Sequence, residues 1–164
     1  MGNLKLLNKN KCLKIFTVAL VLVWSAVIFY LSHQNANDSG SSSLDIIKYV
    51  IESVLNIDLT ISQLDNINSI FRTFMHGFVY FVLSFLSIIA CYTNNVKRKY
   101  IVALIFTFIY SITDEIHQHF IPGRVCDIND IIMDLIGSIT AIGVYICLTK
   151  MLKYVNRKND KIKE

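Results

Sequence analysis

The sequence predicts an all-α membrane protein with four membrane-spanning helices, both termini in the cytoplasm and an amphipathic helix in the first outer loop. Two observations lead to this prediction. The chain of 164 residues is 54% hydrophobic, with a mean hydropathy of +0.50, and its apolar residues form long runs. The net charge of +4 does not indicate nucleic-acid binding, because the basic residues flank those runs as membrane anchors do.

Each apolar run is long enough to cross a bilayer or can be extended to that length. A spanning helix needs roughly 20 residues at about 1.5 Å rise per residue. The third run is short by itself, so its helix is expected to continue to Phe120, where Pro122 and Gly123 stop it. The predicted spans of a single 1–164 domain are residues 15–32, 72–92, 100–120 and 129–150, followed by a basic tail at 151–164.

The distribution of basic residues predicts the orientation. Lysines and arginines concentrate before the first span, between the second and third spans and after the last, whereas the other two loops carry only Lys48, Arg72 and Arg124. Since basic loops stay in the cytoplasm, both termini are expected there and the first and third loops outside. Only Cys126 then faces out, so no internal disulfide is expected. The first run lacks a clear cleavage pattern and is interpreted as a retained helix.

The first outer loop is predicted to contain an amphipathic helix. After a flexible serine-rich stretch, apolar residues recur at helical spacing from Leu44 to Leu55, and charged residues such as Lys48 and Glu52 form the opposite stripe. This pattern is typical of a helix lying on the membrane surface or over the mouth of a bundle. A second short helix is expected from about Ser62 into the second span.

Polar residues of the spans form three stripes, and such residues are costly in a membrane unless they have a partner or a function. Each stripe repeats at intervals of three or four residues, which places its members on one helix face. On the fourth helix, Gly137 and Ala141 continue the stripe and predict close packing. In the predicted topology all three stripes meet in the outer half. The candidate polar site comprises Arg72, His76, Tyr80, Asp114, Glu115, Gln118, Arg124, Asp127, Asp130 and Asp134.

Structural and functional interpretations of these stripes remain open. Arg72 and Arg124 can neutralise the carboxylates, and Tyr80 and Gln118 can join helices by hydrogen bonds. Alternatively, the arginines can bind an anionic head group. The carboxylates, with His76 or His117, can hold a divalent cation or act as acid and base. No cofactor is predicted, although a divalent metal is possible. An ion path is disfavoured by the small number of spans without an inverted repeat.

The segment from Thr113 to Arg124 resembles the VanZ-like family, because it contains the run Asp-Glu-x-x-Gln-x-Phe-x-Pro-Gly-Arg. The similarity extends over residues from about 15 to 150. Further matching positions are Arg72-x-x-x-His76-x-x-x-Tyr80 in the second span, Ser32-His33-Gln34 after the first, and Asp127, Asp130 and Gly137 near the fourth. This chain departs from the pattern at Val125-Cys126, where a small residue often follows the arginine, and at Asp134, where asparagine is common.

The resemblance implies a small bacterial plasma-membrane protein, and the family's founding member is associated with low-level resistance to the glycopeptide teicoplanin. The expected partners are the lipid bilayer and a lipid-linked envelope precursor or a lipoglycopeptide, with no nucleic acid. An intramembrane metal-dependent hydrolase or transferase acting on an envelope lipid is the alternative. A structural partner of a larger complex is a third interpretation. Some members are labelled phosphotransbutyrylase, but this sequence lacks a glycine-rich phosphate loop and a soluble domain for coenzyme A.

Overall fold

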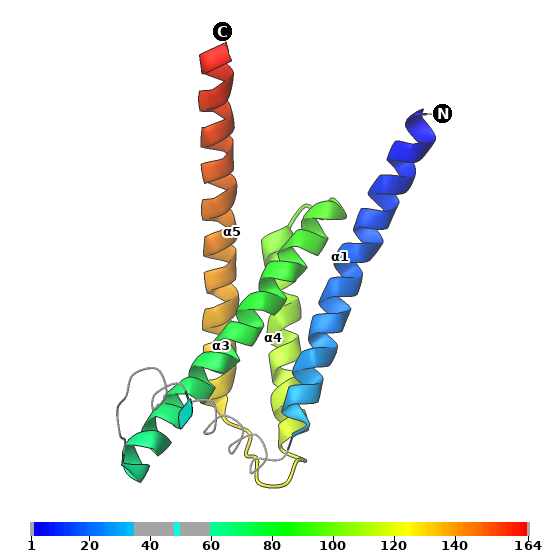
Figure 1. Cartoon of the computed structure of the whole chain (residues 1–164). Helices are drawn as coiled ribbons and strands as arrows, with labels where there is room; N and C mark the ends of the chain where they lie inside the picture. Colours follow the sequence, from blue (N-terminus) through cyan, green and yellow to red (C-terminus); the bar gives the residue numbers. More distant parts are fainter. Residues whose placement is uncertain (1, 35–47, 50–59, 164) are drawn as a thin grey trace.

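The computed structural model describes residues 2–34, 48–49 and 60–163, and every regular element within them is helical. The long helices are α1 (Gly2–Ser32), α3 (Ile61–Thr93), α4 (Lys99–Gln118) and α5 (Ile128–Lys163). Four stretches within them are long and apolar enough to cross a membrane. Figure 1 shows the two chain termini at one end of the bundle and the turn between α4 and α5 at the other. The predicted all-α membrane architecture is therefore confirmed.

The second helix is longer than its predicted span. The backbone N–H of Thr60 donates a 3.0 Å hydrogen bond to Oε1 of Gln63, which satisfies a donor at the start of α3. From there α3 continues unbroken to Thr93, so the short helix expected from about Ser62 is part of it. The amphipathic helix predicted from Leu44 to Leu55 lies outside the described residues except for 48–49, which are helical.

The third helix ends slightly before its predicted limit. α4 stops at Gln118 rather than Phe120, because the N–H of Phe120 bonds to the carbonyl of His117 and tightens the backbone into a turn. Gly123 then takes a φ of 78°, a left-handed conformation that glycine adopts without strain. The acidic cluster therefore lies on the last turns of a helix, as predicted. At the other end of the chain, α5 runs through most of the basic tail.

The bundle places small polar side chains inside and large apolar side chains outside. Fully or nearly fully buried polar residues are Ser84, Thr107, Ser111 and Ser138, and exposed apolar ones include Leu22, Phe29, Ile105 and Ile139. Small polar residues let membrane helices approach and hydrogen-bond one another. For example, the Ser84 hydroxyl on α3 donates to the carbonyl of Ser138 on α5 at 3.1 Å. This distribution suits a protein surrounded by lipid.

The backbones of α3 and α5 touch at a pair of glycines. A Cβ atom added to Gly137 would lie 1.9 Å from the carbonyl oxygen of Gly77, so no larger residue fits without moving a helix. Ala141, one turn further along α5, is fully buried. The close packing predicted for Gly137 and Ala141 is therefore present. Because His76 precedes Gly77, this contact brings that histidine against the acidic stripe of α5.

Candidate functional site

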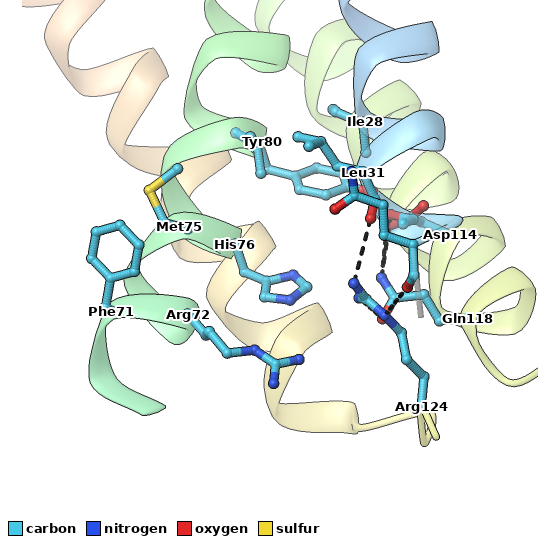
Figure 2. Close-up of a pocket in the computed structure, with 13 residues that line it drawn as sticks. Ile28, Leu31, Phe71, Arg72, Met75, His76, Tyr80, Asp114, Gln118 and Arg124 are labelled. Carbon is cyan, nitrogen blue, oxygen red and sulfur yellow. Dashed lines mark hydrogen bonds between the residues drawn. The ribbon is translucent and has the colours of Figure 1, made fainter. Parts of the chain in front are cut away.

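A cavity of about 280 Å³ opens at the end of the bundle opposite the termini. Its walls come from the end of α1, the first half of α3, the end of α4 and the turn that follows. Apolar side chains form much of the lining, together with charged and polar side chains such as Arg72, His76 and Arg124 (Figure 2). The apolar lining residues are Ile28, Leu31, Phe71, Met75 and Val79.

Arg124 closes one side of this cavity and is held by three acceptors. Its Nε donates to the carbonyl of Gln34 at 3.0 Å, Nη1 to Oε1 of Gln118 at 3.1 Å, and Nη2 to the carbonyl of Leu31 at 3.4 Å. Burial lowers the pKa of the Arg124 guanidinium, and the nearby charge of Arg72 acts in the same direction. An arginine nevertheless remains a cation at neutral pH, so this guanidinium is a fixed positive charge.

Asp114 is the carboxylate of this side, and its hydrogen-bonding needs are met by neighbouring side chains. It is 6% exposed. Its Oδ2 accepts 2.8 Å and 3.1 Å hydrogen bonds from the Ser32 hydroxyl and from Nε2 of Gln118. Gln118 thus links Asp114 to Arg124, and α1, α4 and the turn form one polar network.

Arg72 and Tyr80 also reach the cavity but have no such anchors. Within the described part of the chain, Arg72 forms no hydrogen bond or ion pair, and in Figure 2 its guanidinium extends toward Arg124. The Tyr80 hydroxyl is buried and has no hydrogen-bond partner there, while its ring packs near that of Tyr110. The cavity therefore presents one unpaired guanidinium and one unpaired phenol.

On the α5 side, His76 lies between two carboxylates. Its Nε2 is 3.8 Å from Oδ2 of Asp130, and its Nδ1 is 3.7 Å from Oδ1 of Asp134. Asp134 is 1% exposed, and its other oxygen accepts a 2.6 Å hydrogen bond from the Ser111 hydroxyl. A carboxylate fixed beside one ring nitrogen orients an imidazole and leaves the other nitrogen for a proton or a metal ion.

Glu115 completes this side and is fully buried. Its Oε2 accepts a 3.0 Å hydrogen bond from the backbone N–H of Asp127. Its Oε1 has no hydrogen-bond partner among the described residues. The Asp127 side chain faces outward, where its Oδ1 accepts hydrogen bonds from the backbone and side chain of Asn129 at the start of α5. Glu115 therefore holds the turn with one oxygen and leaves the other without a donor.

A second, polar cavity of about 370 Å³ adjoins the first and shares Arg72 and His76 with it. Its lining residues are Asp65, Asn68, Ser69, Arg72, Thr73, His76, Asp127 and Asp130. The two cavities place an apolar compartment beside a polar one, with an arginine and a histidine at the boundary. Such an arrangement matches a molecule that has an apolar part and a charged part.

The structure gathers the ten residues of the predicted polar site at one end of the bundle. Six line the apolar cavity: Arg72, His76, Tyr80, Asp114, Gln118 and Arg124. The other four surround His76 or the polar cavity: Glu115, Asp127, Asp130 and Asp134. The suggested arginine–carboxylate neutralisation is not seen within the described residues, since neither arginine forms an ion pair with these acids. Gln118 does join two helices, because its Nε2 donates to the Ser32 hydroxyl of α1 at 3.4 Å, whereas the Tyr80 hydroxyl has no hydrogen-bond partner among the described residues.

Two serines of the site were missed from the sequence. Ser32 and Ser111 each donate to a buried carboxylate, on Asp114 and Asp134 respectively. Ser111 lies three and four residues before Asp114 and Glu115, so the helical spacing used for the acids also identifies it. Ser32 belongs to the Ser32-His33-Gln34 segment that resembles the family, but no helical spacing links it to Asp114, because their contact joins the end of α1 to α4.

Comparison with known proteins gives one match. A family model described as VanZ/LLP1 matches residues 16–150, which is most of the chain and includes the whole candidate site. No curated protein matches, and no solved structure matches.

Proposed function

The chain belongs to the VanZ/LLP1 family, and from that premise we propose that it is a bacterial plasma-membrane protein whose polar site binds a lipid-linked or lipidated ligand. The ligand carries an anionic head group, and its binding lowers susceptibility to teicoplanin-type glycopeptide antibiotics. One observation carries the proposal: the lining of the cavity beside α1 combines apolar side chains with two guanidinium groups.

The cavity has the two properties that such a ligand requires. Apolar side chains such as Leu31 and Met75 suit an acyl or prenyl chain, since burying it removes apolar surface from water. Arg72 and Arg124 suit phosphate or carboxylate, which guanidinium groups bind through paired hydrogen bonds. Lipid-linked envelope precursors and lipoglycopeptides both join an apolar chain to anionic groups, so they share the chemistry that this site recognises.

The proposal places the site on the outer side of the membrane. The termini lie at the end of the bundle opposite the site, and the basic residues near the termini favour a cytoplasmic location for them. Cys126, an exposed residue in the turn beside the site, provides the test. An impermeant thiol reagent should label it in intact cells in a variant where the other cysteines are serine. Labelling only after permeabilisation contradicts this orientation.

Arg72→Gln tests the ligand proposal with little risk to the fold, because Arg72 has no described partner. Purified wild-type and variant proteins are compared for binding to nanodiscs or vesicles doped with an anionic undecaprenyl-phosphate lipid. The variant should bind it at least about tenfold more weakly, since one of two guanidinium contacts is lost. Teicoplanin susceptibility of cells expressing each protein is the second readout, and the variant should lose the protection.

Arg98→Gln is the matched control, because it removes the same charge at the other end of α3 and α4. Equal lipid binding by the wild type and the Arg72 variant would refute a head-group role for this cavity. If Arg72→Gln weakens lipid binding but leaves teicoplanin susceptibility unchanged, the lipid-binding site is supported and the link to glycopeptides is rejected.

The alternative function, a metal-dependent hydrolase or transferase acting on an envelope lipid, is favoured by a different observation. His76 lies beside Asp130 and Asp134, and Glu115 is close by, so acid, base and metal-binding groups adjoin the cavity. Release of phosphate or a head group from the bound lipid by purified protein distinguishes this alternative from binding alone.

A further inference from the structure

We propose that His76, Glu115 and Asp130 form a binding site for one divalent transition-metal ion, of the class of Mn²⁺ or Zn²⁺. Each of the three offers one ligand atom, and these atoms all lie within 4.8 Å of one another. The residues come from α3, α4 and α5, so the helix packing itself assembles the set. One imidazole nitrogen with two carboxylate oxygens is a donor set that suits Mn²⁺ and Zn²⁺ better than Ca²⁺.

The spacing of the ligand atoms is close to what an ion requires. Ligands about 2.1 Å from a tetrahedral ion lie about 3.4 Å from each other, and ligands on opposite sides of an octahedral ion lie about 4.2 Å apart. Nε2 of His76 and Oδ2 of Asp130 are 3.8 Å apart. Small side-chain rotations therefore suffice to bring the three atoms onto one ion. Asp130 is partly exposed on the polar cavity, which gives the ion a route into the site.

Glu115 supplies independent support for the ion. Its side chain is fully buried, yet Oε1 has no hydrogen-bond donor among the described residues, and no described arginine or lysine forms an ion pair with it. A buried carboxylate oxygen without a partner costs free energy, so this orientation is expected only where something else binds it. A cation between Glu115, His76 and Asp130 supplies that partner. Protonation of Glu115 is the competing explanation, and it predicts no metal binding.

Asp134 and Ser111 are positioning residues for the same site. The carboxylate of Asp134 lies beside Nδ1 of His76, and the Ser111 hydroxyl fixes that carboxylate from α4. A carboxylate behind a metal-binding histidine sets its tautomer and orients the ring. This arrangement leaves Nε2 of His76 facing Asp130, where the ion would bind.

The ion would also contribute to the proposed lipid binding. His76 lines both the apolar and the polar cavity, and Arg72 lines both with it. An ion on His76 would lie beside the place where the arginines receive an anionic head group, and it would offer a further contact for an oxygen of that group. This role toward the ligand rests on the proposed function, whereas metal binding by the three residues does not.

The test measures metal binding by purified full-length protein in detergent without added lipid. After chelation and desalting, Mn²⁺ and Zn²⁺ are titrated separately, by electron paramagnetic resonance and by calorimetry. Wild-type protein should bind about one ion per chain, and Glu115→Gln and Asp130→Asn should each weaken binding at least about tenfold. Asp160→Asn is the matched control, because it removes a carboxylate from the far end of α5, away from the site, and should bind like wild type.

Asp134→Asn separates a positioning role from a purely structural one. It should weaken Mn²⁺ or Zn²⁺ binding about tenfold while the protein still elutes as wild type does on size exclusion. If Glu115→Gln does not fold, the partly exposed Asp130 provides the decisive variant. Wild-type binding that is absent, or unchanged in Asp130→Asn, would overturn the site. Because the titration contains no lipid, a failure to bind metal would not contradict the lipid-binding proposal. Equally, unchanged lipid binding by Arg72→Gln would not contradict the metal site.

Discussion

The two sides of the polar site differ in how their buried groups are satisfied. On the α1 side, Asp114 accepts two side-chain hydrogen bonds and Arg124 donates three. On the α5 side, Glu115 and Asp134 each leave one buried oxygen without a hydrogen bond among the described residues. Each side contains a buried carboxylate from the end of α4, Asp114 on one and Glu115 on the other, so the difference lies in their hydrogen bonding.

This difference in hydrogen bonding indicates that the two sides have different roles. A network whose members satisfy one another is complete, and it fixes the end of α1 against α4 and the following turn. A cluster of acceptors around one histidine is incomplete, because it has more acceptors than donors and gains from a bound cation. The first side therefore shapes a cavity, while the second contains buried carboxylate oxygens that no donor among the described residues meets.

The largest expected loss of stability follows from disturbing the Gly77–Gly137 contact, which holds His76 against the α5 side of the site. Gly137→Ala places a Cβ within 1.9 Å of a backbone oxygen on α3, so the helices must separate and His76 must leave the acidic stripe. We expect a loss of several kcal/mol of stability, or no folded protein. Thermal unfolding in detergent measures it.

Gly143→Ala is the matched control for that change, because a Cβ at Gly143 has no atom within 4 Å. It should leave the melting temperature unchanged or raise it, since alanine favours a helix by up to about 1 kcal/mol over glycine. Equal melting temperatures for the two variants would mean that the backbones of α3 and α5 do not touch as described.

The sequence predicted the four spanning helices better than the contacts between them. Hydropathy runs identified all four helices, and helical spacing gathered ten polar residues that the structure places at one end. Spacing along one helix cannot specify which carboxylate meets which donor on another. The choice between Ser32 and an arginine as the partner of Asp114 depends on helix rotation and depth. Neutralisation of acids was one of two roles left open for the arginines, and Arg124 instead bonds to two backbone carbonyls and a side-chain amide.

Loss of Arg124 should have the next largest effect and should act on the complete side. Arg124→Gln leaves the acceptors on Gln34, Gln118 and Leu31 without their charged donor, and we expect a loss of about 2 kcal/mol. Arg72→Gln, which removes the same charge without removing a described hydrogen bond, should cost less than about 0.5 kcal/mol. Chemical unfolding in detergent compares the two. A larger loss for Arg72 would reverse the assignment of anchored and unanchored arginines.

The smallest expected difference compares one serine from each side. Ser111→Ala removes the hydroxyl that donates to Oδ2 of Asp134, whose Oδ1 already has no hydrogen bond. The buried carboxylate then has no hydrogen-bond donor, and a cost of about 1–2 kcal/mol is expected. Ser32→Ala removes a comparable bond from Asp114, but Gln118 still donates to the same oxygen, so the cost should stay below about 1 kcal/mol.

Adding metal ions extends the comparison of the two serine variants. If a cation on His76 offsets the charge of the α5 side, saturating Mn²⁺ should raise the melting temperature of the wild type. It should also reduce the difference in melting temperature between Ser111→Ala and the wild type. The same ion should not alter the effect of Ser32→Ala, because Asp114 belongs to the satisfied network. Unfolding curves of the three proteins with and without Mn²⁺ decide this. An equal response of both serine variants would mean that the two sides form one network. The buried oxygens of Glu115 and Asp134 that lack a hydrogen bond would then not mark a separate site.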